Sequence, residues 1–138
     1  MKRTVFLMLA PLFAVACTAD GYSPASPAPV SAAALKDTRW AFTAIDGAAP
    51  LSDRAEIRFD GDRIGATVGC NGMGGTWKLE TGRLSGGPYM STKMWCEGLM
   101  DQEKAIGDLL AENPRVTLEG DVLILQGSKS QAELRRVD

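Results

Sequence analysis

Residues 69–103 read GCNGMGGTWKLETGRLSGGPYMSTKMWCEGLMDQE and carry the strongest structural signals in the chain. This segment begins with Gly69-Cys70-Asn71 and continues through a glycine-rich stretch that predicts a turn before Trp77. It then reaches Thr92-Lys93-Met94-Trp95-Cys96, and an amphipathic helical pattern follows at once. We therefore expect a strand-rich segment with one cysteine near each end, leading directly into a helix.

Turn signals on both sides of this segment predict antiparallel hairpins. Apolar and polar residues alternate before Asp60-Gly61, and the returning strand leads up to Cys70. Similar turns are predicted at Asp46-Gly47, Thr81-Gly82 and Glu119-Gly120-Asp121, and a last strand at residues 132–137. The pattern predicts about seven strands in one antiparallel sheet.

One helix is predicted from about Glu97 to Glu112. At the helical period, one broad apolar face is formed by Leu99, Ala105, Ile106, Leu109 and Leu110. Asn113-Pro114 ends the pattern, because the residue before a proline avoids helical geometry. A single helix among strands must cover one face or one end of the sheet, so the predicted class is α+β, a small β-rich domain with one amphipathic helix.

The N-terminus predicts export. Lys2 and Arg3 precede an almost wholly apolar run, residues 5–16, which is typical of a secretory signal peptide and too short to span a bilayer. Ala14-Val15-Ala16-Cys17 resembles a bacterial lipobox, in which Cys17 is lipidated and becomes the mature N-terminus. The same three residues also suit ordinary cleavage, which would release a soluble periplasmic protein.

The chain is therefore expected to have three parts. Residues 1–16 form the signal peptide, and residues 17–34 form a lipidated cysteine and a Pro/Ala/Ser tether, which would be extended. Residues 35–138 form one domain, long enough to bury a core without a metal. Thr18, in place of an aspartate after the cysteine, favours the outer membrane, with the domain facing the periplasm.

Cysteine counting favours a bridge between Cys70 and Cys96. The chain has three cysteines, and an odd thiol outside the cytosol requires an explanation. Lipid on Cys17 and a disulfide between the other two would account for all three. The alternatives are two small buried thiols or a redox pair.

The composition excludes several classes of chemistry. The chain contains no histidine, which removes histidine triads, Cys-His pairs and histidine metal sites. The formal net charge of −2 and the absence of a basic cluster argue against nucleic-acid binding. We expect a protein that is not an enzyme and has no metal or other cofactor.

Three weaker patterns have simpler explanations. Asp60-Gly61-Asp62 begins like a calcium loop, but Ile64 and Asn71 stand where ligands are required, so a hairpin turn is the better interpretation. The glycines after Gly69 lack a following Gly-Lys-Ser/Thr, and predict positive-φ turns and close strand approach instead of a phosphate loop. Four methionines could form a soft copper site, but methionine more often fills a core: Met73, Met90, Met94 and Met100.

Many of these positions together resemble the META domain, also called the HslJ-like heat-shock protein family. The resemblance extends from about Lys36 to the end of the chain. It rests on Gly69, Cys70, Asn71, Gly75, Trp77, Leu84, Thr92, Met94, Cys96, Met100, Glu103 and Leu110. Two positions differ, because Trp77 stands where a tyrosine is usual and Trp95 replaces a small residue.

The resemblance implies a small α+β domain, often exported or anchored to a membrane, without known catalysis. One bacterial member is linked to heat shock and novobiocin tolerance. The resulting prediction is a non-catalytic envelope lipoprotein that binds an envelope protein or a small apolar ligand and supports stress tolerance. Two alternatives are a pilotin-like assembly lipoprotein and a hydrolase inhibitor. Asn71 is the most characteristic polar residue of the motif, and the segment from Asn71 to Trp77 is predicted to shape the functional surface.

Overall fold

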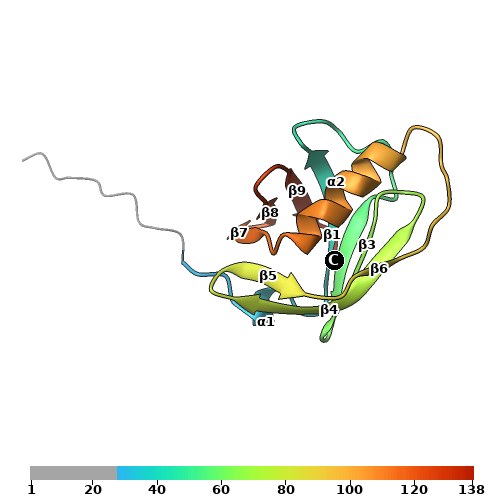
Figure 1. The fold of residues 1–138 in the computed structure, drawn as a ribbon. Coiled ribbons are helices and arrows are strands. Elements are labelled where there is room, and N and C mark those ends of the chain that lie inside the picture. The colour runs from blue at the N-terminus through green and yellow to red at the C-terminus, as the bar shows by residue number, and fades with distance from the viewer. Residues whose placement is uncertain (1–27) are drawn as a thin grey trace, which may run out of the picture.

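The computed structural model describes residues 28–138, so the predicted signal peptide, Cys17 and most of the predicted tether lie outside the described residues. The described part is an antiparallel β-sheet with one long helix packed against it (Figure 1). The elements are α1 (Ala32–Leu35), β1 (Thr38–Ile45), β2 (Glu56–Asp60), β3 (Arg63–Thr67), β4 (Gly72–Glu80), β5 (Arg83–Gly86), β6 (Met90–Ser91), α2 (Met100–Ala111), β7 (Arg115–Glu119), β8 (Val122–Gln126) and β9 (Gln131–Arg136). The α+β class is confirmed, with nine strands in place of the seven predicted.

The sheet closes on itself. Its strand order is β3-β2-β1-β9-β8-β7-β5-β4-β6, and β3 also pairs with β4. The long strand β4 makes this possible, because its first half pairs with β3 and its second half pairs with β5. The short strand β6 adds to β4 through Met73↔Ser91 and Gly74↔Met90. Closure protects backbone groups that an open sheet would leave unpaired at its edges.

Several predicted turns are confirmed. The chain reverses between β2 and β3, between β4 and β5, and between β7 and β8, where glycines with positive φ occupy the turns: Gly61, Gly82 and Gly120. Left-handed backbone is easy for glycine because it has no Cβ. The Asp60-Gly61-Asp62 segment is thus a hairpin turn.

Two predictions of local structure were wrong. Residues 72–75 lie inside β4 and do not form a turn, since the extended ladder with β3 holds them. Helix α2 begins at Met100 and not at Glu97, because Gly98 has φ +80, which is incompatible with a helix. The short helix α1 ends at Leu35, where the domain was predicted to begin, and Leu35 is fully buried.

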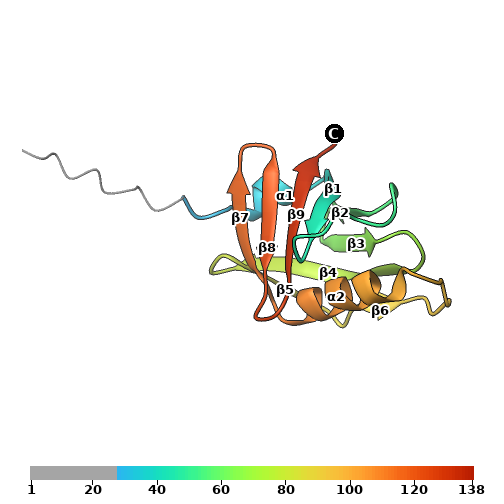
Figure 2. The same ribbon diagram turned by 90° about the horizontal axis from the view of Figure 1, so that it is seen from above.

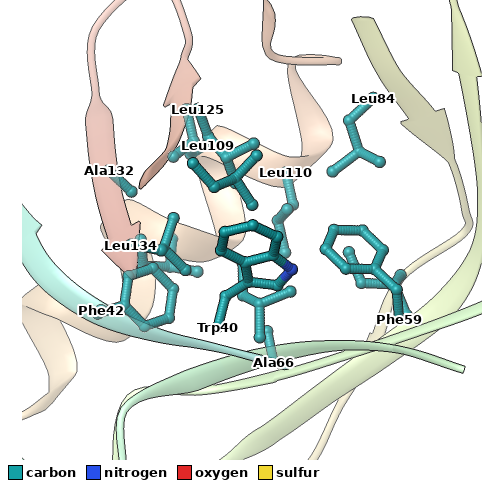
Figure 3. Close-up of a cluster of buried hydrophobic side chains, with 14 of the residues drawn as sticks. Trp40, Phe42, Phe59, Ala66, Leu84, Leu109, Leu110, Leu125, Ala132 and Leu134 are labelled. Atoms are coloured by element: carbon teal, nitrogen blue, oxygen red, sulfur yellow. The ribbon is translucent and has the colours of Figure 1, made fainter. Parts of the chain in front are cut away.

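The core lies between the curved sheet and α2. Figure 3 shows Trp40 at its centre, with Phe42, Phe59 and Leu134 nearby. Of the predicted apolar face of α2, Ile106, Leu109 and Leu110 are buried. Burying a large apolar side chain contributes about 1.5–3 kcal/mol, so this face fixes the helix on the sheet. Within residues 28–138, no helix is long and apolar enough to cross a membrane.

Candidate functional site

The buried side chain of Asn71 is the centre of a polar cluster. It is 2% exposed and lies just before β4. Its Oδ1 accepts hydrogen bonds from the backbone N of Met94 (2.7 Å) and from the hydroxyl of Thr92 (3.0 Å). Its Nδ2 donates to Glu103 Oε2 (2.7 Å) and to the carbonyl of Met94 (2.9 Å). A carboxamide has two donors and two acceptor positions, so every one of them is used here.

Glu103 is the second member of the cluster. It is 7% exposed and lies in the first turn of α2. Its Oε1 accepts a hydrogen bond from the backbone N of Asn71 at 2.6 Å, while its Oε2 is bound by the Asn71 side chain. A negative group is also favoured near a helix N-terminus. Both carboxylate oxygens are therefore committed to holding the start of β4 against the helix.

Thr92 and Met100 extend the same network. The hydroxyl of Thr92 accepts a hydrogen bond from the backbone N of Gly72 (3.2 Å), and its own backbone N donates to the Gly72 carbonyl (3.1 Å). The thioether of Met100 accepts from the backbone N of Cys96 at 3.5 Å. We call Asn71, Thr92, Met94 and Glu103 the Asn71 cluster.

A disulfide joins Cys70 to Cys96 beside this cluster, as predicted. The two Cα atoms are 6.2 Å apart, within the range that a disulfide can span. The bridge links the residue before Asn71 to the loop that carries Met94. Trp95 does not disturb the bridge, because its side chain is 81% exposed.

The other motif residues are structural. Gly69 has φ +119, and a Cβ at this position would lie 2.4 Å from Cβ of Ser52. A Cβ on Gly75 would lie 3.0 Å from the carbonyl oxygen of Pro88. Trp77 is 6% exposed and packs edge-on against Phe59 with centroids 4.8 Å apart. The predicted functional surface at residues 71–77 is therefore mostly interior, and these residues shape the fold.

An accessible groove lies beside the Asn71 cluster, with a cavity volume of ≈ 610 Å³. One wall comes from the strand side: Asn71, Met73, Tyr89, Ser91 and Thr92. The loop that follows contributes Lys93, Met94 and Trp95. The opposite wall is one side of α2, with Met100, Glu103, Lys104, Gly107 and Ala111. Figure 2 shows α2 and β6 side by side, and the lining residues place the groove between them. We call this cavity the helix groove.

Large apolar side chains are exposed around the helix groove. Met94 is 57% exposed and Trp95 is 81% exposed, and both line it. Met90, in the neighbouring strand β6, is 77% exposed. A gathering of exposed large apolar groups on a small domain marks an interaction surface.

The sequence motif includes only some of the residues that line this groove. Asn71, Thr92, Met94, Met100 and Glu103 were singled out in the sequence, and all of them line it. The sequence reasoning missed Tyr89, Lys93, Lys104 and Gly107. The one available signal was Gly107, a glycine in the middle of an otherwise good helical pattern.

Gly107 gives a direct prediction about stability. Its φ is not positive, and a Cβ built there meets nothing within 4 Å. Because glycine inside a helix is about 0.5–1 kcal/mol less favourable than alanine, Gly107→Ala should stabilise the domain by about that amount. Thermal unfolding of the two proteins checks this, and a lower Tm for Gly107→Ala would show that the position is closely packed.

The residues described do not offer an obvious reaction centre. Within residues 28–138, no group of three or more His, Cys, Asp or Glu side chains is placed to hold a metal ion. Glu103, the one carboxylate among the described residues that line the groove, has both oxygens engaged by Asn71. The hydroxyl of Tyr89 is buried and has no hydrogen-bond partner in the described part of the chain, and burial raises the pKa of Tyr89.

A comparison with known protein families identifies the domain that carries the Asn71 cluster. The model of the META domain matches residues 33–138, which include every element from the Asn71 cluster to β9. The chain belongs to the META domain family. The motif read from the sequence thus corresponds, in this META domain, to one cluster of contacts between β4, the loop before α2 and α2 itself.

Two solved structures are similar to this META domain. The first, described only as an NMR structure, is 26% identical, with a TM-score of 0.70, and the match covers 77% of this chain and 94% of that one. The second, an NMR structure of a protein from Burkholderia xenovorans, is 22% identical, with a TM-score of 0.61, and the match covers 96% of this chain and 99% of that one. The second likeness shows the fold alone. A search of curated proteins found no match.

Proposed function

We propose that this protein is a non-catalytic envelope lipoprotein whose META domain binds a small, mainly apolar ligand in the helix groove. The observation that carries the proposal is the groove itself, ≈ 610 Å³ in volume and flanked by exposed Met94 and Trp95. Binding sites for small molecules are typically about 300–1,000 Å³ and lined mostly by apolar side chains with a few polar groups.

The composition of the groove wall supports binding of an apolar body. Met73, Met94 and Met100 all contribute to it. Methionine side chains are flexible and polarizable, so they adapt to ligands of different shape. Trp95 adds a large ring that is exposed to water and would lose apolar exposed area when a ligand covers it.

The use of the polar groups supports binding over catalysis. Ser91 donates its hydroxyl hydrogen bond to the Thr92 carbonyl (2.9 Å), and Thr92 and Glu103 are held in the Asn71 cluster. General acid–base catalysis requires a group that is free to exchange a proton with the substrate. Ser91, Thr92 and Glu103 are instead engaged by neighbouring groups of the protein.

A neutral apolar dye tests ligand binding. N-phenyl-1-naphthylamine should become fluorescent on addition to the purified protein, and the signal should saturate. Gly107→Leu should greatly weaken this binding, because the added side chain extends into the groove. Asp101→Leu is a matched control, since Asp101 is an exposed residue of the same helix and does not line the groove. Equal dye binding by all three proteins would contradict the proposal.

The anchor is the other half of the proposal. Ala14 to Cys17 and the proline-rich segment that follows support a lipid on Cys17, with the domain facing the periplasm from the outer membrane. Stable attachment requires two or more acyl chains, because one chain alone binds a membrane only marginally. A stress-tolerance role in the envelope would suit a ligand-binding domain held close to the membrane.

Intact mass spectrometry of the mature protein checks the anchor. The expected mass is that of a chain beginning at Cys17 with acyl groups attached. Cys17→Ala should abolish the added mass and release the protein from the membrane fraction. An unmodified cysteine at the mature N-terminus would contradict the lipoprotein proposal and favour ordinary cleavage.

A further inference from the structure

We propose that the helix groove takes an anionic amphiphile, a single alkyl chain with a carboxylate or similar headgroup, with the headgroup held between Lys93 and Lys104 and the chain against the apolar lining residues Met73, Met94 and Met100. This inference rests on the proposed function and adds the chemical class of the ligand to it. Four features of the groove carry it.

The first feature is the excess of positive charge among the side chains that line the groove. Its lining contains two lysines, Lys93 and Lys104, and one carboxylate, Glu103. Glu103 is buried, and both its oxygens accept hydrogen bonds from Asn71. The negative charge in the wall is therefore already solvated by amide donors, whereas both lysines are exposed.

The second feature is that both lysines are available. Lys93 is exposed, and among residues 28–138 no carboxylate lies within ion-pair distance of it. Lys104 pairs with Asp108 one helical turn away, but both side chains are more than half exposed. Exposed pairs of this kind contribute little stability, so Lys104 loses little by turning towards a bound anion.

The third feature is that the lining combines charged and apolar side chains. Lys93 comes from the loop and Lys104 from the helix, whereas Met73, Met100 and Ala111 are apolar. A ligand that carries both a charged group and an apolar body can contact both kinds of side chain. A charged headgroup between two ammonium groups gains charge-assisted hydrogen bonds, which are stronger than neutral ones.

The fourth feature is Gly107. Glycine in the middle of a helix is unfavourable, yet here neither a positive φ nor a close neighbour requires it. Its place in the groove wall supplies a reason, because any larger side chain would occupy the space for the alkyl chain. Helix α2 is thus less stable than it would be with alanine at position 107, and the missing side chain leaves the groove open there.

Tyr89 contributes a further polar group to the same wall. Its hydroxyl is buried and lacks a partner among the described residues. Buried polar groups are nearly always hydrogen-bonded in native proteins. If the side chains that cover this hydroxyl move aside, a headgroup oxygen can accept the missing hydrogen bond.

Isothermal titration with three probes that share a ten-carbon alkyl chain tests the charge preference; the ionic probes are kept below their micellar concentrations and decan-1-ol below its solubility. Decanoate should bind the purified protein at least about tenfold more tightly than decan-1-ol, because the headgroup gains charge-assisted hydrogen bonds. Decyltrimethylammonium should bind most weakly. The double variant Lys93→Gln/Lys104→Gln should lose about tenfold in decanoate affinity and keep its decan-1-ol affinity. Lys129→Gln is the matched control, since Lys129 lies outside the groove.

Each other outcome has a definite meaning. Equal binding of decanoate and decan-1-ol, or no effect of the double variant, would overturn the anionic preference and leave the proposed function standing. Failure of decanoate, decan-1-ol and the dye to bind folded protein would overturn both. Binding to vesicles of anionic phospholipid without binding of decanoate would also overturn the inference, because the partner would then be a membrane surface. Unchanged Tm values show that the variants are folded.

Discussion

Asn71→Ala should destabilise the domain by about 3–4 kcal/mol, which is large for a single substitution in a domain of this size. The change removes four side-chain hydrogen bonds from a residue that is 2% exposed. It also leaves the buried Glu103 Oε2 and the part-buried Met94 backbone N without their partners. An unsatisfied buried group costs about 1–3 kcal/mol, and more when it is charged.

Chemical denaturation of wild type and Asn71→Ala measures this effect. Thr81→Ala is a matched control, because the hydroxyl of Thr81 is bonded only to the adjacent Glu80 carbonyl on the exposed surface. That control should change stability by less than about 0.5 kcal/mol. Any loss of ligand binding or stress tolerance in Asn71→Ala should follow the loss of folded protein. Lost binding with an unchanged Tm would instead make Asn71 a ligand contact.

Cys96→Ser should lower the free energy of unfolding by about 3.5 kcal/mol, the chain-entropy value for the loop that this bridge closes. The disulfide joins positions 26 residues apart and ties the loop carrying Met94 to the start of β4. Its loss therefore increases the freedom of the unfolded chain and loosens one wall of the helix groove.

Stability and thiol reactivity together check the bridge. In the native, unreduced protein, Cys70 and Cys96 should resist alkylation, and reduction should lower the Tm of wild type towards that of Cys96→Ser. The variant itself should be insensitive to reductant. Alkylation of both cysteines in unreduced native protein would show that the bridge is absent from the isolated protein.

Local signals in the sequence were sufficient for most of the hairpins. Asp60-Gly61 and Thr81-Gly82 each place a glycine where the turn needs positive φ, so strand pairing between neighbours could be predicted. Closure of the sheet could not be predicted from the sequence, because it depends on the pairing of the two halves of β4 with different strands. The prediction of a turn at the glycines of residues 72–75 was wrong for the same reason. Their conformation is set by pairing with a neighbouring strand and not by the preference of glycine for turns.

The site was only half predictable. The motif identified Asn71 and Glu103, but the direct bond between them joins residues 32 positions apart and depends on where α2 docks. The sequence therefore identified important residues, but it did not show which of them hold the fold together and which line the groove. Lys93 and Lys104 carry no motif signal, and Gly107 carries only that of a glycine inside a helical pattern. That the three share one groove is visible only when the fold places the loop and the helix on its opposite sides.

Backbone amide chemical shifts during a titration with decanoate test the central claim most directly, which is that the helix groove is the binding surface of this META domain. The largest saturable shifts should occur at Tyr89, Lys93, Met94, Lys104 and Gly107, all of which line the groove. Arg83, Arg115 and Ser128, which line a separate cavity, should be unaffected. Saturable shifts centred on that second cavity, with the helix groove unchanged, would contradict the account.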